Sequence, residues 1–202
     1  MNTVELFCGT KSFSKIAKEL GHNTFTSDFD SQFDSDLTKS ILETKRSDFP
    51  LNIDVVWASP PCTCFSVASI GKNWDKETRQ PTNDNAREAL KIVQKTIELI
   101  KEINPKYWFI ENPRGMLRKI DFMQDFKRFT VTYCQYGDTR QKPTDIWTNF
   151  DWKPKPMCKP KATCHISAPR GSRTGTQGLK NAKERSVIPP NLFREIFEQL
   201  KL

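Results

Sequence analysis

Short apolar runs alternate with amphipathic stretches over the first half of the chain, and this alternation restricts the folds that it can adopt. Residues 4–7, 24–27, 54–58 and 107–110 predict strands, and apolar residues recur at helical spacing after the first and third of these runs. The run at 54–58 is too continuously apolar for a half-exposed strand, so we expect it to be buried on both faces. Strands that alternate with helices predict an α/β fold with a parallel sheet.

The length of 202 residues fits one domain with a small appendage. Residues 1–150 hold all the predicted strands, of which the last two predict a closing pair. Residues 151–188 contain four prolines and no apolar run long enough to seed a core, which predicts an insertion with little regular structure. Residues 189–202 predict a final amphipathic helix that packs back on the first domain.

Positive charge is concentrated in the insertion. Residues 152–188 hold nine Lys or Arg residues and one acid, Glu184, and so account for the whole formal net charge of +8. Such a local excess is typical of a surface that binds a phosphate backbone, and a basic segment that only confers solubility is the alternative.

The absence of targeting signals predicts a cytoplasmic protein, and the expected state of the cysteines follows from this location. No stretch approaches the roughly 18 to 20 apolar residues needed to cross a bilayer, and Met1 leads straight into a strand rather than into a signal sequence. In that compartment we expect the six cysteines to be free, catalytic or metal-bound rather than paired as disulfides.

Two of the predicted strands are followed by reactive side chains. Pro60, Pro61 and Cys62 come after the run at 54–58, and Glu111 and Asn112 follow the run at 107–110. The carboxyl ends of parallel strands meet at one edge of a sheet, where open α/β sheets hold ligands. We therefore expect the Cys62 thiol and the Glu111 carboxylate to meet there; in the alternative, Cys62 is a small buried residue and Glu111 caps a strand.

With these motifs the chain resembles a cytosine-5 DNA methyltransferase of the compact form met in phages. A phage-encoded protein of this kind would be located in the cytoplasm of the host. The resemblance spans nearly the whole chain, because Glu5–Gly9, Asp28–Asp30, Ser59–Ser66 and Glu111–Pro113 stand in the family's order. It implies a Rossmann-like S-adenosylmethionine-dependent methyltransferase fold with a mostly parallel central sheet and a small irregular recognition insertion.

The resemblance also implies where S-adenosylmethionine binds. A tight turn at Gly9 lets backbone amides approach the cofactor, Asp28 accepts hydrogen bonds from the ribose hydroxyls, and Phe29 offers a flat face to adenine rather than packing in the core. Asp36 is the alternative acid near the adenine position. The residues expected to contact the cofactor are Phe7, Cys8, Gly9, Thr10, Lys11, Ser12, Asp28, Phe29, Ser40, Ile41, Ser59 and Pro61.

The cofactor loop departs from the family's Gly-x-Gly-Gly pattern. Lys11 and Ser12 stand where glycines are usual, and side chains other than glycine adopt positive φ less freely, so the loop is expected to run differently. Lys11 is a candidate contact for the methionine carboxylate.

The catalytic residues implied by the resemblance are Cys62, Glu111, Asn112 and Lys142. A thiolate added to carbon 6 of cytosine makes carbon 5 reactive toward a methyl group, Glu111 contacts nitrogen 3 and the exocyclic amine, and Asn112 holds the nucleophile loop. Cys64 is the alternative nucleophile, but its distance from Pro61 fits the motif poorly.

A base inside a duplex cannot be attacked in this way, so the target cytosine must be flipped out of the helix. The resemblance implies that the partner is double-stranded DNA and that the enzyme is a monomer. Ser66 and Arg140 are expected to contact the DNA from the pocket, and Arg170 and Arg173 from the insertion. In the alternative, Arg140 and Lys142 are charged residues of a turn whose side chains are exposed to solvent.

Three soft ligands lie within eight residues of the insertion. Cys158, Cys164 and His165 predict a zinc ion that orders a segment too short to fold around its own core, although the sequence offers no evident fourth ligand. Other functions compatible with the sequence are methylation of cytosine in RNA such as tRNA, a catalytically idle zinc-stabilised nucleic-acid-binding protein, and, less compatible with Cys62, an amino-methyltransferase.

Overall fold

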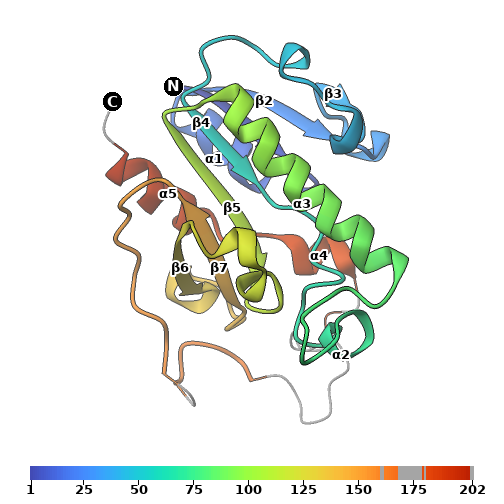
Figure 1. Ribbon diagram of the computed structural model, residues 1–202. Coiled ribbons are helices and arrows are strands. Elements are labelled where there is room, and N and C mark those ends of the chain that lie inside the picture. Colours follow the sequence, from blue (N-terminus) through green and yellow to red (C-terminus); the bar gives the residue numbers. More distant parts are fainter. Residues whose placement is uncertain (160–161, 168–178, 180, 201–202) are drawn as a thin grey trace.

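The structure, a computed structural model, describes residues 1–159, 162–167, 179 and 181–200. In this part of the chain seven strands form one sheet with the order β3-β2-β1-β4-β5-β7-β6 (Figure 1). The strands are β1 Asn2–Leu6, β2 Asn23–Asp28, β3 Leu37–Thr38, β4 Val55–Ala58, β5 Tyr107–Pro113, β6 Lys127–Thr132 and β7 Pro143–Thr148. The α-helices are α1 Ser12–Glu19, α2 Ile70–Asn73, α3 Asp84–Ile103, α4 Ala182–Ser186 and α5 Pro190–Gln199.

The sheet is mostly parallel, as predicted. Strands β3, β2, β1, β4 and β5 run in parallel, whereas β7 pairs antiparallel with both β5 and β6. The chain leaves β1 for β2 on one side and returns to β4 on the other side, so the strand order reverses between β1 and β4. Ligands of open α/β sheets bind outside the carboxyl ends of the strands at such a reversal.

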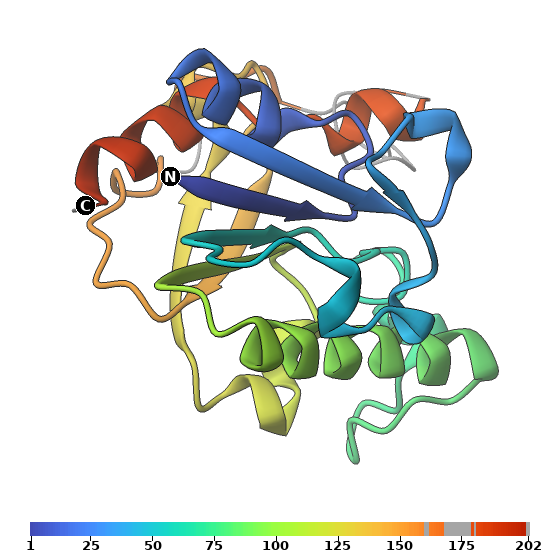
Figure 2. The same ribbon diagram turned by 90° about the horizontal axis from the view of Figure 1, so that it is seen from above.

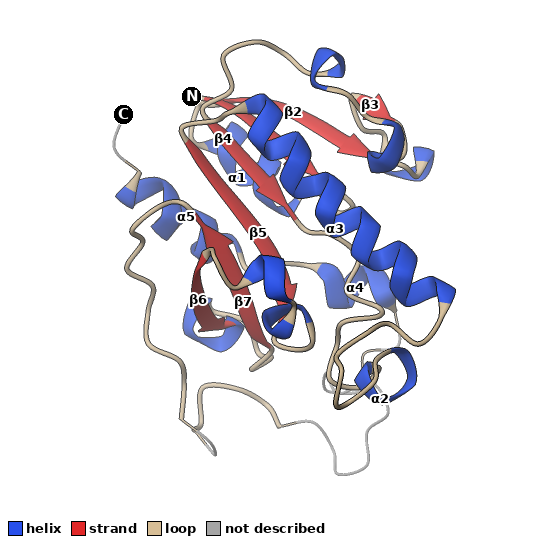
Figure 3. Ribbon diagram, in the orientation of Figure 1, coloured by secondary structure: helices blue, strands red, loops and turns tan. Residues whose placement is uncertain are grey.

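Helices cover both faces of the sheet (Figures 2 and 3). Alternate residues of β4 point to opposite faces, and the strand is fully buried, as its sequence predicts. Val55 and Trp57 pack with the helices α1 and α5, while Val56 and Ala58 pack with α3. Each face therefore has its own apolar core, and the loops at the strand ends are held between two rigid layers.

The helix ends follow local sequence signals. Helix α3 begins after Asn83, whose side chain accepts a hydrogen bond from the backbone N–H of Ala86, and it ends at Asn104 with φ +52°. Helix α1 is followed by Gly21 with φ +80°, and α5 begins at Pro190. These boundaries agree with the predicted ones to within a residue or two.

Strand β5 is longer than the sequence predicts. Expected to end at Ile110, it continues to Pro113, because the antiparallel partner β7 pairs Glu111 with Ile146 and Asn112 with Asp145. Glu111 and Asn112 thus lie inside a central strand rather than in a loop after it. Because β5 is paired with β7 at these positions, the two side chains are held more rigidly than they would be in a loop.

The segment after β7 combines irregular backbone with a short helix that the sequence does not indicate, α4. Trp152 is buried under β6, and Ile188 is buried beside α1 and α5, so both ends of the segment are attached to the body of the protein. The division at residues 150 and 188 stays a prediction. None of the described helices is long and apolar enough to span a membrane.

Candidate active site

The nucleophile loop is the connection that follows β4. Its start is fastened to β5, because Asn112 Nδ2 donates a hydrogen bond to the Pro60 carbonyl at 2.9 Å. The backbone N–H groups of Phe65 and Ser66 both donate to the Cys62 carbonyl at 3.0 Å, which curls the loop into a tight turn. The role expected for Asn112, holding this loop, agrees with this contact.

Glu111 is a buried carboxyl group, 6 % exposed, that lines a cavity together with Cys62. Burial raises its pKa above the usual range, and the Lys142 ammonium and a hydrogen bond from Tyr133 act in the opposite direction. Tyr133 Oη donates to Glu111 Oε1 at 3.0 Å. Tyr133 was not among the predicted site residues, since its position inside an apolar stretch of sequence indicates only a core residue.

Cys62 is half-buried and lines the cavity beside Glu111. Burial raises the pKa of its thiol and the negative charge of Glu111 adds to this, while Lys142 and Arg185 lower the pKa. The reactivity of the thiol therefore depends on these two cations, which offset the effects of burial and of Glu111.

The other thiols near this edge of the sheet are less suited to the nucleophilic role. Cys64 belongs to the buried core, where burial raises its pKa, and its carbonyl accepts a hydrogen bond from Trp74 Nε1 at 2.7 Å. Cys8 lines the same cavity as Cys62, but burial and nearby carboxylates raise its pKa to about 12. The geometry favours Cys62 over both.

A cavity of about 610 Å³ lies between the loops that follow β1 and β4 and the end of β5. Besides Cys62, Glu111 and Lys142 it is lined by most of the predicted cofactor loop and by part of the segment after β7. The residues that line this cavity also include Glu5, Phe7, Cys8, Gly9, Thr10, Ser12, Ser59, Pro61, Ser66, Arg185, Ser186 and Ile188.

A second cavity of about 290 Å³ lies beyond the end of β2 and shares Phe7 and Pro61 with the first. Its walls include Asp28, Phe29, Ser40 and Ile41, all predicted to contact the cofactor. Phe29 is 69 % exposed, so the alternative that it packs in the core is wrong, and its ring is available to a planar ligand. Phe7 and Pro61 thus line both cavities, and the smaller one presents an exposed aromatic ring and a carboxylate.

Asp28 supports the cofactor loop. One of its carboxylate oxygens accepts a hydrogen bond from the backbone N–H of Gly9 at 3.0 Å, and the other accepts from the N–H of Asp30 at 3.1 Å. Asp36, the alternative acid, accepts hydrogen bonds at 2.7 Å from both the N–H and the hydroxyl of Thr26. Asp28 therefore lies at the cavity wall, whereas Asp36 is engaged with β2.

Glu5 is a site residue that the prediction omitted. Its buried carboxylate accepts hydrogen bonds from the N–H groups of Phe13 and Ser14 at 3.2 and 2.9 Å, and so satisfies the first turn of α1, which has no N-cap side chain. Burial raises its pKa to about 7. An acid between the apolar residues Val4 and Leu6 was the signal in the sequence.

The cofactor loop places Lys11 in a conformation that suits glycine. Lys11 has φ +57°, a left-handed conformation that is costly for residues other than glycine and Asn. Its ammonium donates to the Asp34 carbonyl at 2.5 Å and lines a separate cavity with Lys15 and Gln32. Lys11 does not line the cavity that holds Cys62 and Glu111, and its contact with the methionine carboxylate stays a prediction.

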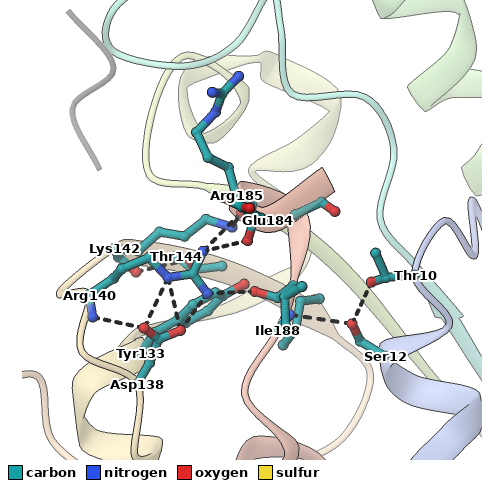
Figure 4. A network of polar contacts seen from close by, with 12 residues as sticks. Thr10, Ser12, Tyr133, Asp138, Arg140, Lys142, Thr144, Glu184, Arg185 and Ile188 are labelled. Carbon is teal, nitrogen blue, oxygen red and sulfur yellow. Dashed lines mark hydrogen bonds and ion pairs between the residues drawn. The ribbon is translucent and has the colours of Figure 1, made fainter. Parts of the chain in front are cut away.

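Arg140 and Lys142 are not solvated turn charges. Arg140 is 6 % exposed, forms an ion pair with Asp138, and donates to the carbonyls of Glu184, Arg185 and Val187. Lys142 Nζ donates to the Arg185 carbonyl at 2.9 Å and lies 4.7 Å from the centre of the Tyr133 ring (Figure 4).

The structure thus uses Arg140 to hold the segment around α4 against the active site, instead of presenting it to nucleic acid as expected. This clamp brings Arg185, Ser186 and Ile188 to the cavity wall, where the Ile188 N–H approaches Ser12 Oγ at 3.4 Å. These contacts join residues more than forty positions apart, and no sequence pattern indicated them.

Of the residues expected to contact DNA, Ser66 lines the larger cavity and pairs through its hydroxyl with Ser69 at 3.0 Å. Arg170 and Arg173 lie outside the described residues.

The predicted metal ligands Cys158, Cys164 and His165 lie together, and the structure adds Cys134: the four ligand atoms are all within 4.8 Å of one another. The missing fourth ligand comes from the β6–β7 connection, far from the other three in sequence.

The comparisons agree with this geometry. The family model described as C-5 cytosine-specific DNA methylase matches residues 1–133. A protein of Frog virus 3 (isolate Goorha), named probable DNA (cytosine-5)-methyltransferase, is 28 % identical over 219 residues that cover 98 % of this chain and 99 % of that protein.

Solved structures with the same fold are longer. A putative DNA modification methyltransferase encoded within a prophage of E. coli has a TM-score of 0.51 at 15 % identity, covering 73 % of this chain and 46 % of that one. The Entamoeba histolytica methyltransferase EhMeth has a TM-score of 0.51 at 14 % identity, covering 76 % and 55 %. This chain therefore spans about half the length of these structures, with the α/β fold of methyltransferases. Since the family model matches well over half of its residues, the chain belongs to the C-5 cytosine-specific DNA methylase family.

Proposed function

We propose that the protein transfers a methyl group from S-adenosylmethionine to carbon 5 of a cytosine in DNA, with Cys62 as the nucleophile. The observation that carries this proposal is the larger cavity, which unites the Cys62 thiol, the Glu111 carboxyl group and the cofactor loop. A thiol and an acid beside a cofactor cavity are the groups that this chemistry needs.

In this proposal S-adenosylmethionine supplies the methyl group, and the smaller cavity takes its adenosine. Phe29 would stack on the adenine and Asp28 would accept hydrogen bonds from the ribose, while Phe7 and Pro61, which line both cavities, would contact the cofactor between its two ends. Glu5, beside the larger cavity, suits a ligand with a positive charge, because a nearby cation favours its ionised form.

The target cytosine enters the larger cavity after it has been flipped out of the duplex. The Cys62 sulfur adds to carbon 6, while Glu111, whose raised pKa lets it carry a proton, hydrogen-bonds nitrogen 3 and the exocyclic amine. Tyr133 holds Glu111 through a hydrogen bond, and the positive charge of Lys142 lowers the pKa of the Cys62 thiol. After methyl transfer, loss of the carbon 5 proton expels the Cys62 sulfur and restores the aromatic ring.

The same proposal covers partners and location. We expect a monomeric enzyme that acts on double-stranded DNA in the cytoplasm, which is the host's cytoplasm if the protein is encoded by a phage. All six cysteines are free of disulfide bonds, as this compartment favours.

We also propose that Cys158, Cys164 and His165 hold a structural zinc ion, because their ligand atoms converge.

A trapping experiment tests the function. The protein is incubated with S-adenosylmethionine and duplex DNA that contains 5-fluorocytosine, and the covalent adduct is located by mass spectrometry. We expect an adduct on Cys62 that Cys62→Ala abolishes and Cys64→Ala retains. An adduct with fluorinated RNA alone would indicate an RNA methyltransferase, and no adduct with either, together with retained DNA binding, would indicate an idle nucleic-acid-binding protein.

A further inference from the structure

Four soft metal ligands converge beside the active site from two distant parts of the chain. Cys134 lies in the short 3-10 helix Tyr133–Tyr136, which follows β6. Cys158, Cys164 and His165 lie in the irregular segment after β7. Three cysteines and one histidine are a donor set that structural zinc sites use.

Three of the distances between the ligand atoms are close to those around one tetrahedral ion, and all four atoms lie within 4.8 Å of one another. With Zn–S near 2.3 Å and Zn–N near 2.0 Å, tetrahedral geometry places two sulfurs about 3.8 Å apart and a sulfur and a nitrogen about 3.6 Å apart. The sulfurs of Cys134 and Cys164 are 3.6 Å apart, and His165 Nδ1 is 3.6 Å from Cys164 Sγ and 3.8 Å from Cys158 Sγ. These separations are much longer than the roughly 2.05 Å of a disulfide bond.

Amide donors around the cluster suit thiolate ligands. Gln141 Nε2 lies 3.2 Å from Cys158 Sγ, and Gln135 Nε2 lies 3.5 Å from Cys164 Sγ. N–H groups directed at ligand atoms orient them and stabilise their negative charge. Both glutamines belong to the β6–β7 connection, so this connection contributes one ligand and the hydrogen bonds to two others.

Among the described residues next to the cluster, the segment that carries three of the ligands exposes its large apolar side chains. Ile166 and Met157 are exposed, and the contacts to the β6–β7 connection are polar ones. The Cys158 N–H donates to Thr132 Oγ1 at 3.0 Å, and the Ile166 N–H donates to the Thr139 carbonyl at 2.8 Å. A metal ion supplies the binding free energy that such a segment lacks.

We propose that Cys134, Cys158, Cys164 and His165 bind one zinc ion that fastens the segment after β7 to the active-site wall and thereby positions Glu111. Cys134 is the neighbour of Tyr133, whose hydroxyl donates to Glu111 at 3.0 Å. The ion thus fixes the 3-10 helix on which both residues lie. The positioning of Glu111 rests on the proposed methyl transfer, whereas the binding of zinc does not.

Metal content tests the site without any assay of activity. We expect the purified protein to hold one zinc ion per chain by native mass spectrometry and inductively coupled plasma measurement. Cys134→Ser and Cys164→Ser should each lose the ion, and Cys62→Ala, a matched loss of one thiol, should keep it. Gln141→Ala should weaken zinc binding about tenfold. Loss of zinc in Cys158→Ser but not in Cys134→Ser would overturn the assignment of the fourth ligand.

Cobalt substitution reports the ligand set directly. Co²⁺ added to the metal-free protein should give thiolate-to-cobalt charge-transfer bands that weaken in Cys134→Ser and stay unchanged in Cys62→Ala. A protein that carries no zinc and gives no such bands, or that shows a disulfide between Cys134 and Cys164 under reducing conditions, would overturn the proposal.

The positioning role has a separate readout. Removal of zinc should speed hydrogen exchange at the backbone N–H groups of Cys158 and Ile166, whose hydrogen bonds hold the segment to β6 and to the β6–β7 connection. It should also slow formation of the Cys62 adduct, and Tyr133→Phe should show the slower adduct formation even when zinc is bound. A zinc-free protein that forms the adduct at the full rate would limit the ion to a structural role and overturn its link to Glu111. Because zinc content is measured independently, failure of the methyl transfer itself would leave that measurement intact.

Discussion

At the active site, a half-buried thiol must ionise beside a buried carboxyl group. Burial and Glu111 raise the pKa of Cys62, and Lys142 and Arg185 lower it. Lys142 is itself held between the Arg185 carbonyl and the Tyr133 ring, so its charge stays close to both catalytic groups. We therefore expect the rate of addition to cytosine to depend on Lys142 as well as on the two residues named by the motifs.

Lys142→Met tests this dependence. Without the ammonium the pKa of Cys62 rises further, so the limb of the pH–rate profile that climbs with thiolate formation moves to higher pH. Charges this close interact by about 1–4 kcal/mol, so adduct formation at pH 7 should fall about tenfold or more. Lys142→Arg keeps the charge and should keep the position of the limb; an unshifted profile in Lys142→Met would show that the cation does not act on Cys62.

Tyr133→Phe removes the hydroxyl that donates to Glu111 and leaves the ring in place. The hydrogen bond lowers the pKa of Glu111, so this pKa should rise, and the loss of a buried bond to a charged group costs about 1.5–3 kcal/mol, or roughly ten- to hundredfold in the rate. Tyr136→Phe is the matched control, because Tyr136 donates to Glu195 at 2.8 Å, outside the cavity. Equal rates in the two variants would contradict the positioning role.

At the scale of elements, the nucleophile loop and the end of β5 are fitted closely against each other. Met116 N donates to the Phe65 carbonyl at 2.7 Å, and Ser66 forms a bridge with Gly115. A Cβ atom at Gly115 would lie only 2.1 Å from the Phe65 carbonyl oxygen. The loop therefore keeps its place only while residue 115 has no side chain.

Gly115→Ala should displace the nucleophile loop. The clash is with backbone, so we expect a loss of about 1–3 kcal/mol in the free energy of unfolding and a larger loss of adduct formation. Gly71→Ala is the control: nothing lies within 4 Å of its added Cβ, and the helical position should gain about 0.5–1 kcal/mol. Urea unfolding and the trapping assay measure both effects; full adduct formation in Gly115→Ala would show that the loop tolerates displacement.

Lys11→Gly tests the strain in the cofactor loop. The left-handed conformation of Lys11 costs a residue with a side chain about 1 kcal/mol, so glycine should stabilise the protein by about that amount. Lys15→Gly, within α1, should instead destabilise it by about 1 kcal/mol. Calorimetric titration of S-adenosylmethionine should give the same affinity for Lys11→Gly as for the wild type, and a large loss would restore Lys11 as a cofactor ligand.

At the scale of the whole molecule, the segment around α4 returns to the sheet edge and completes the active-site wall. The buried pair of Asp138 and Arg140 holds this segment by its carbonyl groups (Figure 4). A buried pair of this kind contributes little net stability, but the removal of one partner leaves the other charge uncompensated. The wall of the cavity therefore depends on contacts between residues about 45 positions apart in the chain.

Arg140→Met should lower the free energy of unfolding by about 3–5 kcal/mol and open the cavity at Arg185 and Ser186. The double variant Asp138→Asn with Arg140→Met should recover part of this loss, because it removes the lone carboxylate. Denaturant unfolding and hydrogen exchange of residues 184–188 measure the two effects. Unchanged protection of that segment would contradict the role of Arg140 as a clamp.

The sequence by itself determined the parallel sheet, most element boundaries and the motif residues Cys62 and Glu111, because strand and helix periodicity, capping residues and short motifs are encoded within a few positions. Only the tertiary structure decided that Glu111 lies within a paired strand, that Arg140 is buried, that the Lys11 ammonium bonds to the Asp34 carbonyl, and that the Cys134 thiol lies beside Cys158, Cys164 and His165. Each of these depends on which distant segments pack together, and the balance of burial, charge pairing and chain geometry that selects this packing leaves no local pattern in the sequence.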